Sequence, residues 1–190
     1  VARATERLSQ GEIFEFQIGL QADTREASYF AMVSDKTASL ISASCRIGPL
    51  MADAPREMVE ALTKYGESLG LAFQIADDIL DFTGDASTLG KPVGHDLRER
   101  KITLPLIKAL DAAPESERAE IVGILSSSEP TETDWTRVCS FVEQHNGVAA
   151  AQDTAHAYAA QAQACLEMLP SSISRSILET AVRLVVERDS

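Results

Sequence analysis

Length, composition and charge exclude several classes of protein. The 190 residues are 45% hydrophobic with modest numbers of Gly and Pro, as in a folded domain with a sizeable core. The chain has 29 acidic and 17 basic residues, which gives a net charge of −12. This charge argues against nucleic acid as the main partner, because a phosphate backbone requires a basic face. The three cysteines are far apart in the sequence, which argues against disulfides and favours the reducing cytoplasm. No apolar run approaches the roughly 20 residues that a transmembrane helix needs.

Apolar residues recur at three- and four-residue spacing almost throughout the chain, and this period predicts helices rather than strands. The expected helices, punctuated by Gly and Pro, lie near residues 1–21, 25–48, 55–83, 102–112, 115–127, 131–145, 147–168 and 171–188. The polar stretch from Gly84 to Lys101 is expected to be a connection between two apolar helices. We therefore expect residues 1–190 to form a single all-α domain.

An acidic turn lies within the apolar helix expected over residues 55–83. Asp77 and Asp81 are spaced i, i+4, and Asp78 and Asp81 are spaced i, i+3, so a helix can bring all three carboxylates to one face. Like charges at this spacing destabilise a helix, and Mg²⁺, which prefers carboxylate oxygens, would relieve their repulsion. A solvated acidic face is the plain alternative, but the strongly apolar neighbours favour a face turned toward a cleft.

Two lysines follow within reach of such a cleft. Lys91 lies in the polar connection, and Lys101 stands where the next helix is expected to begin. A lysine is a compact cation suited to phosphate oxygens, and a helix start adds free backbone donors for anions. Acids and lysines together predict a site for a metal-bound diphosphate.

Several motifs in one order resemble the second aspartate-rich region of trans-isoprenyl diphosphate synthases. They cover residues 1 to about 110 and comprise Gly11-Glu12, Lys36-Thr37-Ala38-Ser39-Leu40, the run from Gly70 to Asp81 that contains Gln74, Gly84-Asp85, Gly90-Lys91, Gly94-His95-Asp96-Leu97 and Lys101-Ile102-Thr103-Leu104-Pro105. One position departs from the family, because Glu15 stands where a Gln is usual, with Gln17 two residues further on. The resemblance implies a partial isoprenoid-synthase helical bundle whose N-terminal helices are absent from this chain.

The resemblance also implies a set of metal-binding acids. Asp77 and Asp81 would bind Mg²⁺ as cofactor. Asp78 and Asp96 would be further ligands or carboxylates that support the ligands. Charge aimed at a leaving diphosphate favours its departure.

The substrates implied by the resemblance are an allylic diphosphate and isopentenyl diphosphate. Lys36, Lys91 and Lys101 would hold the allylic diphosphate, and Thr37 and Gln74 would flank the allylic carbocation and stabilise it with their dipoles. Isopentenyl diphosphate would attack this cation, and loss of a proton would complete one elongation. The expected assembly is a homodimer.

Other interpretations stay open. A class I terpene cyclase also uses an acidic DDxxD motif, although the residues from His95 to Lys101 fit the synthase pattern better. A non-catalytic subunit of a heteromeric synthase and an acidic helical interaction domain are further alternatives. The family's first Asp-rich motif is not found here, so we expect the chain to be a fragment of a full-length enzyme, an ordered portion of one, or a subunit that needs a partner. We favour a fragment or partial chain, because the sequence opens inside an expected helix, and we expect no prenyl transfer from these 190 residues alone. Product length cannot be assigned, although the motifs lean toward the polyprenyl branch.

Overall fold

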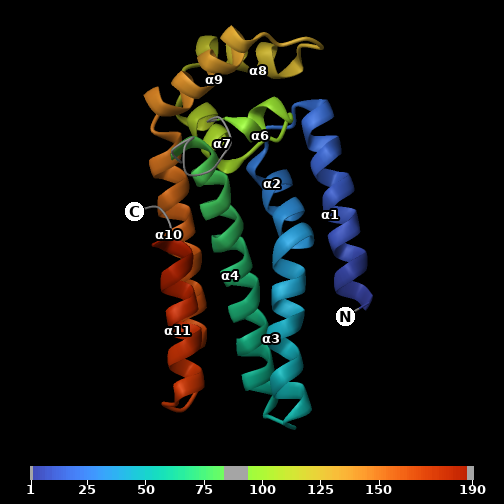
Figure 1. Ribbon diagram of the computed structural model, residues 1–190, viewed down its shortest axis with the longest axis vertical. Coiled ribbons are helices and arrows are strands. Elements are labelled where there is room, and N and C mark those ends of the chain that lie inside the picture. The colour runs from blue at the N-terminus through green and yellow to red at the C-terminus, as the bar shows by residue number, and fades with distance from the viewer. Residues whose placement is uncertain (1, 84–93, 188–190) are drawn as a thin grey trace.

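The computed structural model describes residues 2–83 and 94–187, which are helical and contain no strand. The long axis of the molecule is followed by α1 (Ala2–Gln21), α3 (Ser39–Met51), α4 (Arg56–Thr83), α10 (Gly147–Cys165) and α11 (Ile173–Val186) (Figure 1). One end of this bundle carries the shorter helices α6 (His95–Arg98), α7 (Leu104–Ala112), α8 (Glu115–Ser126) and α9 (Glu132–Gln144). The prediction of an all-α bundle is confirmed. None of the described helices is long and apolar enough to cross a membrane.

The segment predicted as one helix over residues 25–48 is divided in three. Helix α2 (Glu26–Val33) passes into a π-helical turn, η1 (Ser34–Ala38), which continues as α3. A π-turn accommodates one extra residue, and such turns are frequent at functional sites. Lys36 and Thr37 therefore stand on an irregular turn rather than on a regular helix.

Helix α4 lies at the centre of the fold and is buried on two sides. Ile75 and Ile79 belong to a core shared with α2, α7, α9 and α10. Ala72 and Ala76 belong to a second core shared with α10 and α11, in which the small side chain of Ala162 lets α10 pack closely on α4. The apolar residues around the acidic turn thus anchor α4 between these two cores.

Two glycines allow other helices to approach η1 closely. A Cβ atom on Gly11 of α1 would lie 2.4 Å from the backbone nitrogen of Lys36, and one on Gly70 of α4 would lie 2.6 Å from the Cα of Ala38. Real Cβ atoms do not approach backbone so closely, so both positions require glycine. The turn that carries Lys36 and Thr37 is held from both sides by backbone contact.

Candidate functional site

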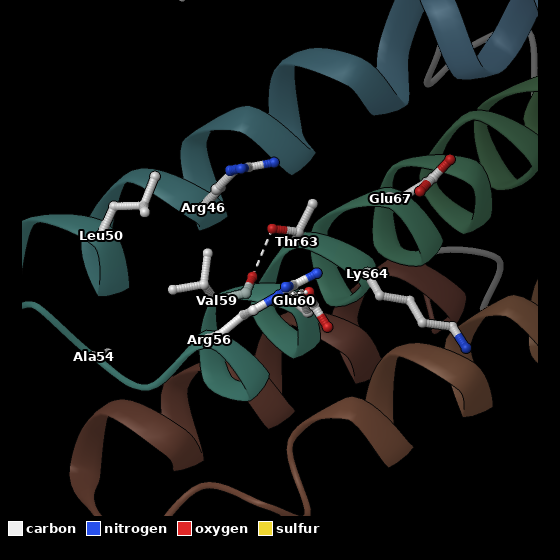
Figure 2. A pocket seen from close by; sticks show the side chains of 9 residues that line it. All are labelled: Arg46, Leu50, Ala54, Arg56, Val59, Glu60, Thr63, Lys64 and Glu67. Carbon is white, nitrogen blue, oxygen red and sulfur yellow. Dashed lines mark hydrogen bonds and ion pairs between the residues drawn. The ribbon is translucent and has the colours of Figure 1, made fainter.

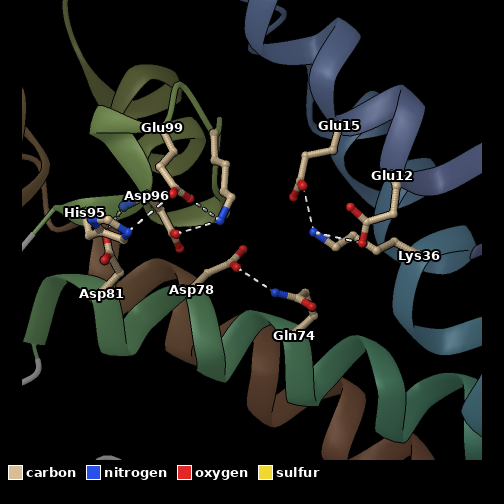
Figure 3. Close-up of polar contacts among 10 residues, drawn as sticks. Glu12, Glu15, Lys36, Gln74, Asp78, Asp81, His95, Asp96 and Glu99 are labelled. Carbon is tan, nitrogen blue, oxygen red and sulfur yellow. Dashed lines mark hydrogen bonds and ion pairs between the residues drawn. The ribbon is translucent and has the colours of Figure 1, made fainter. Parts of the chain in front are cut away.

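Polar side chains from three parts of the fold face one another beside the C-terminal half of α4 (Figure 3). They come from α4, from α1 with η1, and from α6 with the turn that follows it, and include Gln74, Asp78, Asp81, Glu12, Glu15, Lys36, His95, Asp96 and Glu99. A cavity of 480 Å³ opens between α1 and the turn after α6, lined by Glu12, Glu15, Phe16, Gly19, Leu20, Glu99, Arg100 and Lys101. Most of the predicted site residues therefore lie around one region.

A second cavity, of 890 Å³, lies between α3 and the first half of α4 (Figure 2). Its lining includes the cationic side chains of Arg46, Arg56 and Lys64, with Arg56 already paired to Glu60 at 2.6 Å. Arg46 comes from α3, and Arg56 and Lys64 come from the opposite end of α4 from the acidic turn, so this cavity is separate from the predicted site.

The three acids of the turn differ in burial, which spacing alone does not show. Asp78 is only 4% exposed, Asp81 is half-buried and Asp77 is exposed. The reason is the 100° rotation between successive helical residues, which sends Asp77 and Asp78 to different surroundings. Asp78 lies between α4 and α2, where Tyr29 contacts it, while Asp77 is exposed.

Burial controls the protonation of the two inner acids. Burial raises the pKa of Asp78 to about 7, although hydrogen bonds from Tyr29 and Gln74 act in the opposite direction. Burial and the charge of Asp96 also raise the pKa of Asp81, whose Oδ2 accepts a 3.1 Å hydrogen bond from the backbone nitrogen of Asp96. A second bond, from the backbone nitrogen of Gly94 to the carbonyl oxygen of Asp81 at 2.9 Å, fixes the start of α6 to α4.

Each of the two described lysines of the predicted site lies between two carboxylates. Lys36 Nζ is 2.6 Å from Glu15 Oε2 and 3.6 Å from Glu12 Oε1. Lys101 Nζ is 2.9 Å from Asp96 Oδ1 and 2.8 Å from Glu99 Oε2. Burial acts to lower the pKa of Lys101, but the bonds to Glu99 and Asp96 outweigh it and raise the pKa. Both lysines are held by acids that an incoming anion would have to displace.

The position that departs from the family has a defined partner. Glu15 is the closer of the two acids at Lys36, whereas Gln17 is exposed on another side of α1. A glutamine at position 15 could accept a hydrogen bond from Lys36 but would not form an ion pair. Gln17 therefore does not take the place of the usual glutamine.

Thr37 and Gln74 are in direct contact. Thr37 Oγ1 donates to Gln74 Oε1 at 2.7 Å, and Gln74 Nε2 donates to Asp78 Oδ1 at 3.0 Å. Asp78 Oδ2 accepts from Tyr29 Oη at 2.6 Å. Sequence reasoning missed Tyr29, because 49 residues separate it from Asp78 and only the fold brings them together.

The donor chemistry of the site fits a hard divalent cation. Carboxylate oxygens are its preferred ligands, and the charge of Asp96 disfavours ionisation of both Asp78 and Asp81, a repulsion that a cation would relieve. Over residues 2–83 and 94–187, however, no three His, Cys, Asp or Glu side chains are already grouped as a metal site. Lys91 lies outside the described residues.

The chain is similar to known proteins of one family. The family described as polyprenyl synthetase matches residues 1–142. A short chain isoprenyl diphosphate synthase of Methanothermobacter thermautotrophicus is 34% identical over 183 residues, which is 96% of this chain and 56% of that protein. The chain thus spans little more than half the length of this relative.

Solved structures match the whole chain. A decaprenyl diphosphate synthase from Rhodobacter capsulatus has a TM-score of 0.90 and 34% identity, covering 100% of this chain and 58% of its own. A polyprenyl synthase from Caulobacter crescentus, complexed with calcium and isoprenyl diphosphate, has a TM-score of 0.89 and 36% identity with the same coverage. On its fold, its site and these matches, the chain belongs to the polyprenyl synthetase family.

Proposed function

We propose that the protein containing this chain is a trans-prenyltransferase, which condenses an allylic diphosphate with isopentenyl diphosphate to give a longer polyprenyl diphosphate. The observation that carries the proposal is the contact between Thr37 and Gln74, at 2.7 Å, beside an acidic turn and two lysines. This arrangement combines cations for a diphosphate with neutral oxygens for an allylic cation. Relatives named as isoprenyl diphosphate synthases support it.

The lysines are the residues that would hold the diphosphate. Lys36 and Lys101 already lie against carboxylates, and a diphosphate carries more charge than any one of these carboxylates. Lys91 is proposed as a third cation on the evidence of its motif alone. The positive charges of these lysines would stabilise the negative charge that develops on the diphosphate as the C–O bond of the allylic substrate breaks, which lowers the barrier to ionisation.

The metal proposed for this site is Mg²⁺, and Asp77 and Asp81 are the acids best placed to hold it, with Asp96 in support. When bound, Mg²⁺ would neutralise charge that develops on the departing diphosphate. Asp78 is assigned a different task here, because both of its oxygens are engaged by Tyr29 and Gln74 within the fold. The related Caulobacter structure, described as a complex with calcium and isoprenyl diphosphate, supports a divalent cation and a prenyl diphosphate as ligands of this protein.

Thr37 and Gln74 would stabilise the allylic cation with their oxygens. Thr37 uses its proton to reach Gln74, so lone pairs of the Thr37 oxygen remain for a neighbouring positive charge. The double bond of isopentenyl diphosphate then attacks the allylic carbon, and a proton leaves the product. We also propose a homodimer in a reducing cytoplasm as the working state.

Product analysis tests this proposal directly. The purified protein that contains this chain is incubated with labelled isopentenyl diphosphate, an allylic diphosphate and Mg²⁺. We expect label in a longer prenyl diphosphate. A class I terpene cyclase would instead release a cyclic hydrocarbon without consuming isopentenyl diphosphate, and that result would contradict the proposal.

Replacement of Asp77 tests the metal assignment in the same assay. Asp77→Ala should lower turnover by about a hundredfold or more, because charge at the leaving group is lost, while the melting temperature stays near that of the wild type. Asp153→Ala, another exposed aspartate on a helix, is the matched control and should retain full turnover. A near-normal rate for Asp77→Ala would remove Asp77 from the metal site.

A further inference from the structure

A buried tyrosine is linked to the Thr37–Gln74 pair by an unbroken series of hydrogen bonds. Tyr29, on α2, is 1% exposed, and its hydroxyl donates to Asp78 at 2.6 Å. Asp78 accepts at its other oxygen from Gln74, at 3.0 Å, and Gln74 accepts from Thr37 at 2.7 Å. The series therefore crosses from α2 through α4 to η1.

This series has a consequence for the orientation of the Gln74 amide. Asp78 Oδ1 faces the nitrogen of the amide, which leaves the amide oxygen for the hydroxyl of Thr37. With Asp78 ionised, an amide turned by half a rotation would bring its oxygen against a carboxylate oxygen, and two acceptors would oppose each other. The position of Asp78 therefore decides which atom of Gln74 faces Thr37.

Tyr29 in turn decides the position of Asp78. Its phenol reaches Asp78 from a different helix, and the two groups are nearly inaccessible to water, so no solvent molecule can replace the missing donor at low cost. The same bond keeps Asp78 inside the fold, away from the exposed side of α4 where Asp77 lies.

We propose that Tyr29 is a positioning residue for prenyl transfer, whose hydroxyl acts through Asp78 and Gln74 to fix the oxygens that face the allylic cation. This inference rests on the proposed function. The other account is that Tyr29 only fills the core, where its ring packs edge-on against Phe30 with 5.4 Å between centroids. Tyr29→Phe separates the two accounts, because it keeps the ring and removes only the hydroxyl.

The chain offers a matched control in Tyr65. Tyr65 is also 1% exposed, and its hydroxyl donates to the backbone carbonyl of Leu178 at 3.0 Å, in the other core of the bundle. Tyr65→Phe therefore removes one buried hydroxyl with one hydrogen bond at a position that has no link to Gln74 or Thr37. A loss common to both variants reports on stability, and a loss confined to Tyr29→Phe reports on the site.

Steady-state kinetics of the purified protein is the first test. Tyr29→Phe should lower kcat by about tenfold to a hundredfold, as misplacement of reacting groups does, whereas KM for the allylic diphosphate should change by less than about threefold because the lysines are untouched. Tyr65→Phe should stay within about twofold of the wild type in both constants. If Tyr29→Phe has the kcat of Tyr65→Phe, the positioning role is wrong.

Urea unfolding provides a second readout that does not depend on turnover. Tyr29→Phe and Thr37→Val remove the hydroxyls at the two ends of the series. We expect the double variant to lower the urea midpoint by less than the sum of the two single losses, which would show that the two ends are linked. Tyr65→Phe combined with Thr37→Val should be additive. Additive losses for Tyr29→Phe and Thr37→Val would overturn the inference even in an active enzyme. If the wild type shows no turnover but the midpoint losses are still non-additive, the proposed reaction is wrong and the hydrogen-bonded link between Tyr29 and Thr37 stands.

Discussion

At the residue scale, Asp78 differs from its acidic neighbours because water does not reach it. Its pKa of about 7 in the folded protein lies above the ordinary value of 3.8, and burial is the main cause. The folded state therefore keeps a proton that the unfolded state has released between about pH 4 and pH 7, so stability falls as pH rises through this window. The two hydrogen bonds to Asp78 reduce this cost without removing it.

Asp78→Asn should abolish this part of the pH dependence. Between pH 5 and pH 8 the wild type should lose roughly 3 kcal/mol of unfolding free energy that Asp78→Asn does not lose, because the amide has no proton to release. The measurement is urea unfolding over this pH range in buffer with EDTA, so that bound cations do not alter the titration. Parallel pH profiles for the two proteins would show that Asp78 ionises normally.

Glu15 is the residue at which this chain departs from the family, and its charge competes with a diphosphate for Lys36. The two side chains are about four-fifths buried, with 20% of Lys36 and 18% of Glu15 exposed, and their 2.6 Å contact is shielded from bulk solvent. Any anion that binds Lys36 must weaken this pair.

Glu15→Gln should therefore tighten the binding of inorganic pyrophosphate with Mg²⁺ by roughly fivefold, the equivalent of about 1 kcal/mol for a lost ion pair. Calorimetric titration measures the change. Glu12→Gln is the control, because Glu12 is more exposed and lies 3.6 Å from Lys36, and its effect should be smaller. Weaker binding by Glu15→Gln would mean that the ion pair holds Lys36 in its working position.

At the scale of elements, η1 is the part of the fold that the sequence pattern could not predict. The apolar period over residues 25–48 indicates one helix, and the extra residue of a π-turn changes this period too little to be noticed. By contrast, α4 and α7 begin and end within two residues of their predicted limits, because Pro and Gly mark their ends. The short helix α6 was missed, since the polar stretch around it indicates only a connection.

Gly11→Ala tests whether close helix contact holds η1 in place. The new Cβ would lie 2.4 Å from the backbone nitrogen of Lys36, so α1 and η1 must move apart, and both stability and turnover should fall. Gly123→Ala on α8 is the control, because nothing lies within 4 Å of its Cβ position. It should be neutral or stabilise the protein by up to about 1 kcal/mol.

Urea unfolding and turnover of the two glycine variants complete this test. We expect a lower urea midpoint for Gly11→Ala by the equivalent of about 1–3 kcal/mol, as for overpacked sites, and no loss for Gly123→Ala. Equal behaviour of the two variants would show that α1 and η1 separate without consequence.

At the scale of the whole molecule, the sequence predicts the class of fold but not the arrangement of charge around the predicted site. Motif order placed Lys36, Thr37, Gln74 and Lys101 together, and the structure brings their elements side by side. Spacing could not show that Asp78 turns inward, because helical spacing gives relative angles and not which side of the helix is covered. The pairing of Lys36 with Glu15 was equally hidden, since the two residues come from different helices.

The claim on which the account depends is that α4, η1 and α6 together bind a divalent cation and a diphosphate. A crystal structure of the protein with Mn²⁺ and inorganic pyrophosphate tests it most directly, because anomalous scattering locates the metal. The account predicts metal against Asp77 and Asp81, and pyrophosphate against Lys36 and Lys101, which would have left Glu15 and Glu99. Metal and pyrophosphate bound elsewhere, with both lysines still paired to their acids, would contradict it.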